Sequence, residues 1–552
     1  MLKINTMKYC GKYCERIFLT ISLFFIVAYV GFAGNKPDFI GVNKVVLDNQ
    51  SKLISWITPQ NRAYDQFLRQ RWNFIKTQVP NYPGSGPMSS YPQYYFYCAY
   101  NSKNGKLAEP DSNWMNDVAE KIPNWFESAR LYYAYTGDTT VMTIVKNLTD
   151  YAIEHGTSPS TFSWQNFPYT TANGGDMEFR GFTSSKKLFL HEIQVDHAGD
   201  QGLTYDRLYL YTGDEKYKTA ALNVANTLAS KVRTGSATQS PWPYRVVMST
   251  GEVKAEYGAN WAGCYALLDN LVRANLGNVE AYREACKKVR DFILQYPMKT
   301  GYWTDCHTDN DCNSNTYKSN MSASNIKLYI LDHPEFDPDW KTDIPMLIKW
   351  TEDYFVFRCY KDEPATQWGA NIVGEQDMAP IKMDYMTARY AAECARWYAV
   401  SGDETYKEKA YRSLNWVTYC NDSIGMAFES PVSKGVVSWW SDCYGECPRM
   451  FYHALAAVPE WAPQGENHIL YSEGVLKKVF YADKKVEYTA TDNAGTEYLR
   501  LAFKPTEITV NGIKISKRSD LNDEGYILKD IGNGDYAVNI KRMRAGKVIV
   551  SG

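Results

Sequence analysis

The fold is indicated most clearly by a short turn, Tyr211-Thr212-Gly213-Asp214-Glu215-Lys216-Tyr217, that recurs along the chain. Gly can take the left-handed conformation that ends one helix, and Asp or Asn caps the next. Each copy therefore predicts a helical hairpin. The other copies are Tyr135-Thr136-Gly137-Asp138, Leu276-Gly277-Asn278-Val279-Glu280-Ala281-Tyr282, Val400-Ser401-Gly402-Asp403-Glu404-Thr405-Tyr406 and the looser Asp332-His333-Pro334-Glu335-Phe336.

The number of hairpins predicts a closed ring. A helix at residues 446–458 has no partner after it, and an opening helix at 60–79 can supply one, which gives twelve helices in six hairpins. Stacked hairpins bury a continuous core, and a closed ring leaves no exposed end. The 76 residues between Gly137 and Gly213 are too many for a tetratricopeptide array. We therefore predict a mainly α fold, an (α/α)6 toroid over residues 45–462.

After Trp461 the pattern changes to short strands. Alternating stretches such as Val486-Glu487-Tyr488-Thr489 read as half-buried strands, and Asn511-Gly512 lies between two apolar runs, as in a hairpin turn. Residues 466–552 are expected to form a small C-terminal β-sandwich domain with a packing or ancillary role.

The composition excludes some partners and favours others. The 552 residues include 60 Lys and Arg against 62 Asp and Glu, and this balance offers no field for nucleic acid or an anionic membrane. The 43 Tyr and 16 Trp lie partly in loops, where rings can stack on sugars, although large cores that use Tyr explain them equally well. A carbohydrate substrate is the expected partner, and no oligomeric state is predicted.

The N-terminus has the pattern of a signal peptide, predicted over residues 1–34. Basic residues up to Arg16 precede an apolar run from Ile17 to Val30, and the small residues of Gly31-Phe32-Ala33-Gly34 follow. We expect export to the periplasm or the medium, with no membrane contact after cleavage. An uncleaved anchor is the alternative.

The cysteines and one acidic loop raise the question of crosslinks and metals. In an exported protein, Cys306 with Cys312 and Cys443 with Cys447 could form disulfides. Cys264 and Cys394 lie in helical segments and are expected to be buried thiols. No cofactor or catalytic metal is predicted. A structural calcium is an option at Asp305, Asp309, Asn310, Asp311 and Asn313, which lack the closing Glu of an EF-hand. The favoured alternative is a solvated loop bridged by Cys306 and Cys312.

The long connections locate the expected site. They lie at about 157–190, 235–257, 298–320, 357–380 and 422–441, and in a toroid they gather at one end. The site should then lie at the N-termini of the inner helices, whose positive dipole ends favour an anionic group.

The segment before the second inner helix is the most suggestive. Asp196 and Asp200 are four residues apart and share a helix face beside His197. The alternatives are that Asp196 is a cap and His197 a satisfied polar residue. The alternative to a catalytic role is helix capping for Asp384 and a place in a loop turn for Asp442.

Two chemistries fit these residues. Hydrolysis needs an acid and a second carboxylate, for which Asp200 with Asp384 or Asp442 is the candidate pair. Elimination beside a uronate needs a base, a group that neutralises the carboxylate and an acid. His197 or Tyr385 is the candidate base, Asn260 the candidate group that neutralises the carboxylate, and Tyr444 the candidate acid. The candidates for holding the sugar are Arg180, Arg245, Trp125, Trp261, Trp439 and Trp440.

The six hairpins, the aromatic loops on one face and the signal peptide together resemble the (α/α)6 carbohydrate-active enzymes. These include the unsaturated glucuronyl hydrolases of glycoside hydrolase families 88 and 105, other toroid glycosidases and toroid polysaccharide lyases. The resemblance is architectural, and no catalytic motif matches residue by residue. It implies a reaction class only, the cleavage of glycosidic bonds. Together with the signal peptide and the candidate residues, it leads us to expect an exported glycoside hydrolase acting on uronate-containing glycans. A lyase or dehydratase and a non-catalytic glycan-binding protein are the alternatives.

Overall fold

The computed structural model describes residues 39–103, 106–110, 115–184, 187–304, 317–357, 364–377, 381–431, 438–440 and 442–552. The predicted signal peptide, the Cys306–Cys312 pair and the acidic loop between them lie outside these ranges. None of the helices within these ranges has the length and apolarity that a membrane span requires.

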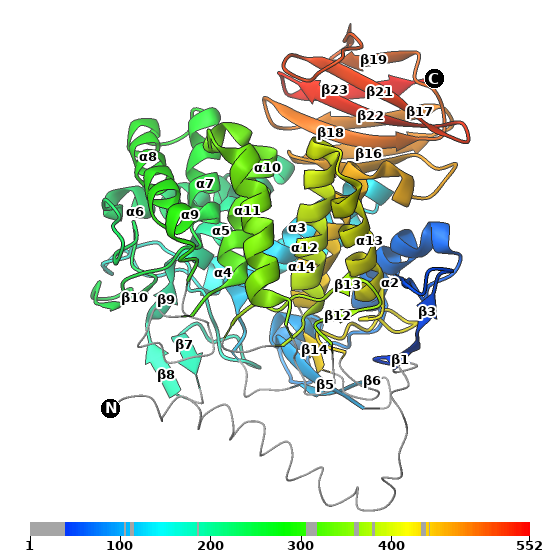
Figure 1. Cartoon of the computed structure of the whole chain (residues 1–552). Helices are drawn as coiled ribbons and strands as arrows, with labels where there is room; N and C mark the ends of the chain where they lie inside the picture. The colour runs from blue at the N-terminus through cyan, green and yellow to red at the C-terminus, as the bar shows by residue number, and fades with distance from the viewer. Residues whose placement is uncertain are drawn as a thin grey trace, which may run out of the picture. The chain divides into compact units, whose positions relative to one another are not determined.

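Six helices form a closed inner ring (Figure 1). Each contacts the next, and the last returns to the first, because α14 packs on α3. Their sequences are rich in Ala and other small residues on buried faces, which lets the helices approach closely. The six are α3 (Val118–Thr136), α5 (Val195–Thr212), α7 (Ala262–Arg273), α10 (Asn320–Asp332), α12 (Asp384–Ser401) and α14 (Asp442–Ala457).

Six further helices pair with the inner ones from outside, which confirms the predicted fold class. The helix α2 packs on α14 and so supplies the missing partner of the sixth hairpin. The outer helices are α2 (Ala63–Thr77), α4 (Thr140–His155), α6 (Glu215–Lys231), α8 (Val279–Gln295), α11 (Trp340–Phe355) and α13 (Glu404–Thr418). A one-turn helix, α9 (Pro297–Thr300), follows α8.

The turns have the predicted chemistry. Gly137, Gly213 and Gly402 end α3, α5 and α12 in the left-handed conformation, with φ of 79°, 77° and 72°. The side chains of Asp214 and Asp403 then accept hydrogen bonds from backbone N–H groups in the first turns of α6 and α13. The local sequence alone therefore sets where these helices end and begin.

The long connections are not structureless, since they contain short strands. Two three-stranded sheets, with orders β11-β10-β9 and β14-β5-β6, lie at the end of the ring where the inner helices begin. The strands are β5 (Ala99–Lys103), β6 (Lys106–Pro110), β9 (Glu192–Gln194), β10 (Arg245–Val247), β11 (Val253–Ala255) and β14 (Ser438–Trp440). Two-stranded pairs are β1 (Phe39–Ile40) with β2 (Asn43–Lys44), β3 (Val46–Leu47) with β4 (Leu53–Ile54), β7 (Gly181–Ser184) with β8 (Lys187–Leu190), and β12 (Thr366–Gln367) with β13 (Ala370–Asn371).

The C-terminal part consists of two antiparallel sheets, with orders β15-β18-β22-β21 and β16-β17-β23-β19-β20. In β17 every second residue is buried, as the sequence alternation predicts. Asn511 and Gly512 both have positive φ, as a type I′ turn requires. The strands are β15 (His468–Ser472), β16 (Leu476–Ala482), β17 (Lys485–Ala490), β18 (Gly495–Leu501), β19 (Glu507–Val510), β20 (Ile513–Lys514), β21 (Gly525–Gly532), β22 (Asp535–Arg542) and β23 (Gly546–Ser551).

The sheets pack against the C-terminal end of α3. The Tyr481 hydroxyl donates to the Ala134 carbonyl, and the Val479 N–H donates to the Tyr133 hydroxyl at 3.0 Å. The ring of His468 stacks on that of Tyr135, with centroids 4.0 Å apart. All five residues of β15 are buried, so this strand belongs to the interior of the molecule.

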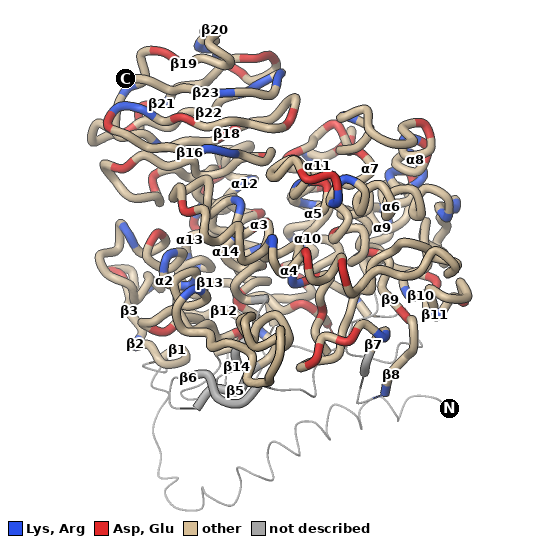
Figure 2. Tube along the Cα trace, turned by 180° about the vertical axis from the view of Figure 1, so that it is seen from behind, with Lys and Arg blue, Asp and Glu red and all other residues tan. Residues whose placement is uncertain are grey.

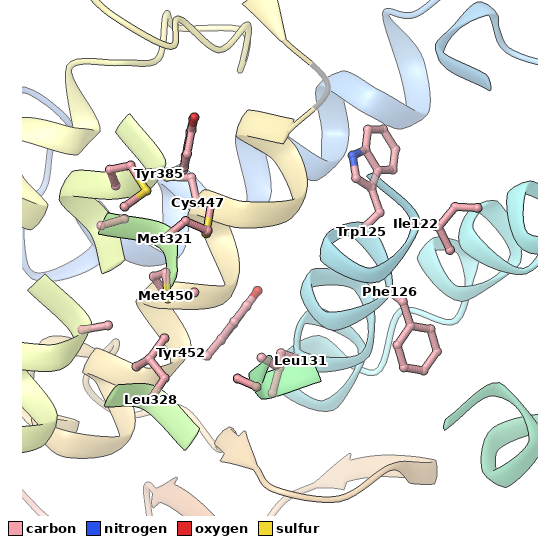
Figure 3. Close-up of a cluster of buried hydrophobic side chains, with 14 of the residues drawn as sticks. Ile122, Trp125, Phe126, Leu131, Met321, Leu328, Tyr385, Cys447, Met450 and Tyr452 are labelled. Carbon is pink, nitrogen blue, oxygen red and sulfur yellow. The ribbon is translucent and has the colours of Figure 1, made fainter. Parts of the chain in front are cut away.

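Large aromatic and thiol side chains fill the layers between the inner and outer helices. Figure 3 shows Trp125 and Phe126 of α3 in such a cluster, together with Cys447 and Tyr452 of α14. Cys264 and Cys394 are buried thiols, as predicted, and Cys443 and Cys447 are also buried and do not form the suggested disulfide. Outside the core, Lys and Arg are interspersed with Asp and Glu along the trace (Figure 2), consistent with the balanced net charge.

Candidate active site

A cavity of about 180 Å³ lies inside the ring and is lined by all six inner helices. Near the helix N-termini it is lined by Glu120, His197 and Met321. Near the C-termini it is lined by His333 of the α10 end and by Tyr471 of β15. The cavity therefore runs along the ring axis, from the face of the long connections towards the β domain.

Asp200 projects into this cavity from α5. Burial raises the pKa of its carboxyl to about 7, against the opposing influence of the positive charge of His197. The carboxylate lies where a side chain at position 263 would stand, since a Cβ on Gly263 would be 1.7 Å from Asp200 Oδ1. Gly263 therefore gives Asp200 its place, and Asp200 can hold a proton near neutral pH.

A chain of hydrogen bonds crosses four elements beside Asp200. The Asn260 amide donates to Asp196 Oδ2 at 2.9 Å, and the Asn325 amide donates to Asn260 Oδ1 at 2.9 Å. Arg389 continues the chain with a bond to Asn325 Oδ1 at 2.8 Å and a bidentate pair to Glu446 at 2.6 and 2.7 Å. Because each member fixes the next, the network holds the cavity wall in one arrangement.

His197 lies at the start of this chain between two aspartates. Its Nε2 is 3.8 Å from Asp196 Oδ2, and its Nδ1 is 3.6 Å from Asp117 Oδ1. Burial opposes a charge on the ring, but Asp196 and Asp117 outweigh it and raise the pKa of His197 well above its usual value. The ring is therefore an imidazolium at neutral pH in the protein without ligands.

Two arginines on neighbouring helices share one carboxylate. Arg389 and Arg449 both donate to Glu446, whose pKa they lower although burial opposes its charge. The Nε of Arg449 is buried and has no hydrogen-bond partner among the described residues. The two arginines and Glu446 together carry a net charge of one positive unit. Arg449 can therefore donate a hydrogen bond to an anion in the cavity.

A second charged group lies further along the wall. Glu127 is held between Arg130, at 2.6 Å, and Arg207, and although burial opposes its charge these two hold its pKa well below the usual value. Arg130 also donates to the carbonyls of Ser472 and Gly474. This carboxylate is therefore a fixed charge that also ties α3 to the β domain.

The floor of the cavity combines helix and strand residues. Asp332 of α10 pairs with Arg396 at 2.7 Å and accepts a hydrogen bond from the Tyr471 hydroxyl at 2.7 Å. The ring of His453 lies against that of Tyr471, tilted by 40° with centroids 4.4 Å apart, and burial lowers the pKa of His453 to about 3. His453 is therefore neutral at neutral pH, whereas the pKa of His197, near the other end, is raised well above its usual value.

The structure brings three of the predicted site residues together, namely His197, Asp200 and Asn260. Asp384 lies outside this cavity, as a fully buried partner of Arg71 at 3.1 Å, where burial raises its pKa to about 6. The hydroxyl of Tyr385 donates to Glu375 at 2.8 Å. Both side chains hold the start of α12 in place.

Tyr444 and two of the predicted tryptophans also lie outside the cavity lining. The Tyr444 hydroxyl accepts from the Ala427 N–H and donates to the Gly425 carbonyl, so it fixes a loop. Trp125 and Trp261 are fully buried. The first packs among Trp72 and other rings, and the second against Trp242, which leaves neither face for a sugar.

The predicted arginines are both engaged elsewhere. Arg180 is exposed and pairs with Glu178, and Arg245 is buried against Glu192 at 2.5 Å with its guanidinium 4.0 Å from the centre of the Phe182 ring. Trp439 and Trp440 lie in β14 and Asp442 begins α14, but their side chains lie outside what the structure describes.

The cationic residues that do line the cavity are Arg389 and Arg449, which sequence analysis did not select. Arg389 stands within the apolar run Ala388-Arg389-Tyr390-Ala391, and such a charge inside a buried helix is a usable signal. Both arginines lie beyond the first turn of their helices, away from the helix starts and loops where the sequence predicts the site.

Comparison with known proteins identifies the fold and no family. No family model and no curated protein sequence matches this chain. Among solved structures, it is similar to cellobiose 2-epimerase from Spirochaeta thermophila, with 10% identity over 73% of this chain and 98% of that one, at a TM-score of 0.51.

Other similar structures include hydrolases. A family 76 glycoside hydrolase from a bovine Bacteroides thetaiotaomicron strain matches with 12% identity over 72% of this chain and 78% of that one, at a TM-score of 0.45. An unsaturated glucuronyl hydrolase specific for heparin matches with 9% identity over 72% and 96%, at a TM-score of 0.42. The expected resemblance is confirmed at the level of fold: the helical body is an (α/α)6 toroid, and the structures it is similar to are carbohydrate-active enzymes.

Proposed function

We propose that this protein is an exported enzyme that cleaves a glycosidic bond next to a uronate, by hydrolysis, inside the cavity of the toroid. The observation that carries the proposal is the buried carboxyl of Asp200 in the cavity lining. Burial raises its pKa to about 7, which suits a group that delivers a proton to a leaving oxygen at neutral pH. Export rests on the signal-peptide pattern of residues 1–34.

The charged wall supports an acidic sugar as substrate. Arg389 and Arg449 both lower the pKa of Asp200, so they stand close to the proposed acid. A uronate carboxylate bound at the free Nε of Arg449 would place the neighbouring glycosidic oxygen beside Asp200. The attacking water would be positioned by the carboxylates of Asp117 and Glu120, which lie next to His197.

The residues considered for elimination support that reaction less. His197 is charged at neutral pH and cannot accept a proton, and burial raises the pKa of Tyr385 well above its usual value, which opposes its use as a base. The Tyr444 hydroxyl is bonded to the backbone on both sides. An epimerase remains the second candidate, because the similar structure with the TM-score of 0.51 is an epimerase.

The proposal is tested by following ultraviolet absorbance and sugar release together on saturated uronides, unsaturated uronides and neutral disaccharides. Sugar release from a saturated uronide without new absorbance supports it, and so does a fall in absorbance on an unsaturated one. A rise means elimination, and a changed sugar without bond cleavage means epimerisation. Either result overturns hydrolysis.

Variants of one helix make the assignment specific. Asp200→Asn should lower kcat by on the order of a hundredfold or more, since it removes the proton donor. Asp206→Asn is the matched control, because Asp206 is also buried on α5 with a pKa raised to about 6 but does not line the cavity. Equal activity of the Asp200 variant and the wild type would refute the proposed role.

A further inference from the structure

Three potential metal ligands meet at the rim of the cavity where the inner helices begin. Asp117 immediately precedes α3, Glu120 lies in its first turn, and His197 lies in the first turn of α5. One ligand atom from each lies within 4.8 Å of the other two. An ion that binds its ligands at about 2.0 to 2.4 Å fits between atoms at such distances after small side-chain movements.

Asp117 supplies a second and independent observation. The residue is 8% exposed, and neither of its carboxylate oxygens has a hydrogen-bond partner in the part of the chain that the structure describes. His197 Nδ1 is likewise buried without a hydrogen bond, and its 3.6 Å separation from Asp117 is too long for one. The His197 ring faces the Asp117 carboxylate at 3.6 Å, but neither carboxylate oxygen accepts a hydrogen bond from a described residue. A bound cation would compensate this buried charge more closely.

The surrounding charge favours a cation at the same point. Asp196 stands on the opposite side of the imidazole, with Oδ2 at 3.8 Å from Nε2, so three carboxylates face one ring. The arginines of the cavity wall form their ion pairs with Glu446 and Glu127, and the charge of Glu120 also reaches one of them, Arg389. The local balance at the rim is therefore negative.

We propose that Asp117, Glu120 and His197 bind one divalent cation. An imidazole with two carboxylates suits a first-row transition ion such as Mn²⁺ or Zn²⁺ better than Ca²⁺, which prefers oxygen ligands alone. Three protein ligands leave positions open for water or for sugar hydroxyls. The ion would lie about one helical turn from Asp200, because His197 and Asp200 are three residues apart on α5.

Mn²⁺ is the probe of choice, because the buried thiols of this chain would confuse a zinc measurement. The full mature chain, free of any tag and with metal removed, is titrated with Mn²⁺ at pH 7.5 while electron paramagnetic resonance reports the free ion. We expect saturation at one ion per chain. Asp117→Asn, Glu120→Gln and His197→Gln should each weaken binding by more than about tenfold.

The matched control is Glu154→Gln. Glu154 and His155 form an exposed carboxylate–imidazole pair at 3.9 Å that the structure does not join to a third ligand, so this variant should bind Mn²⁺ like the wild type. Thermal unfolding without metal verifies that each variant is folded. The absence of saturable binding, or binding that all three ligand variants retain, overturns the proposal, whatever the outcome of the glycan assays.

Discussion

At the scale of single residues, the carboxyl group of Asp200 links protonation to stability. Its pKa is about 7 in the folded protein and about 3.8 when unperturbed, so the folded state binds the proton more tightly. This contribution to stability is present in full below about pH 4 and is lost as the pH rises through about 7.

Replacing Asp200 by Asn should therefore stabilise the protein in alkaline solution. We expect the variant to have a higher thermal midpoint than the wild type at pH 8, because no charge is buried, and nearly the same midpoint at pH 4. Scanning calorimetry across this range measures the difference. A variant that is less stable at pH 8 would contradict the burial of an ionised Asp200.

Gly263 tests the placement of the same carboxyl group. A methyl group there would approach Asp200 Cγ to 2.5 Å, so Gly263→Ala should displace the carboxylate while α7 remains helical. If hydrolysis is observed, we expect kcat to fall at least about tenfold with the circular dichroism spectrum unchanged. Unaltered kinetics would mean that the position of Asp200 does not matter.

At the scale of elements, glycine serves two different purposes. Gly213 ends α5 with φ of 77° and has open space around it, whereas Gly199 lies inside α5 with the Cys264 Sγ of α7 only 2.2 Å from where its Cβ would stand. The first glycine sets a backbone conformation, and the second sets the distance between two helices.

Alanine at the two positions should distinguish these purposes. Gly213→Ala should lower the free energy of unfolding by about 1 kcal/mol, from backbone strain alone. Gly199→Ala should lower it by up to about 3 kcal/mol, because the helices must move apart. Removing the side chain at position 264, in the double variant Gly199→Ala with Cys264→Gly, should recover part of the stability lost in Gly199→Ala. The same change should recover none of the stability lost in Gly213→Ala. Denaturant titrations measure all three.

The elements themselves were largely predictable. The glycine turns and their caps are local, so the helices α3, α5 and α12 end at the predicted glycines. The short sheets of the connections were not, because their strands pair across distance, as when Trp439 of β14 pairs with Tyr100 of β5. Such pairing leaves no periodic signal in segments of two to five residues.

At the scale of the whole molecule, the β domain completes the interior of the toroid. Leu470 and Tyr471 of β15 belong to the main hydrophobic core, and Tyr471 lines the cavity. Arg130 of α3 donates to carbonyls of Ser472 and Gly474 just beyond. The sequence suggested packing or an ancillary role, and the contacts place this strand at the cavity floor.

A chain that ends at residue 462 should therefore not be an independent stable unit. Such a chain lacks β15, so the floor of the cavity would be exposed and Asp332 would lose the hydrogen bond from the Tyr471 hydroxyl. We expect aggregation or a strongly lowered midpoint, whereas Tyr471→Phe in the full chain should cost only about 1 kcal/mol. Wild-type stability of the truncated chain would show that the β domain is dispensable.

The sequence by itself determined the toroid, its hairpins and the presence of a C-terminal β region, because turn chemistry and periodicity are local properties. It also singled out His197, Asp200 and Asn260, which the structure brings together in the cavity lining. Only the tertiary structure decided that Asp384, Trp125 and Trp261 are buried elsewhere, since a polar or aromatic residue at a helix start looks the same whether it faces the lumen or the outer layer. The partnership of Arg389, Arg449 and Glu446 was likewise invisible, because it depends on the closure that brings α12 and α14 together.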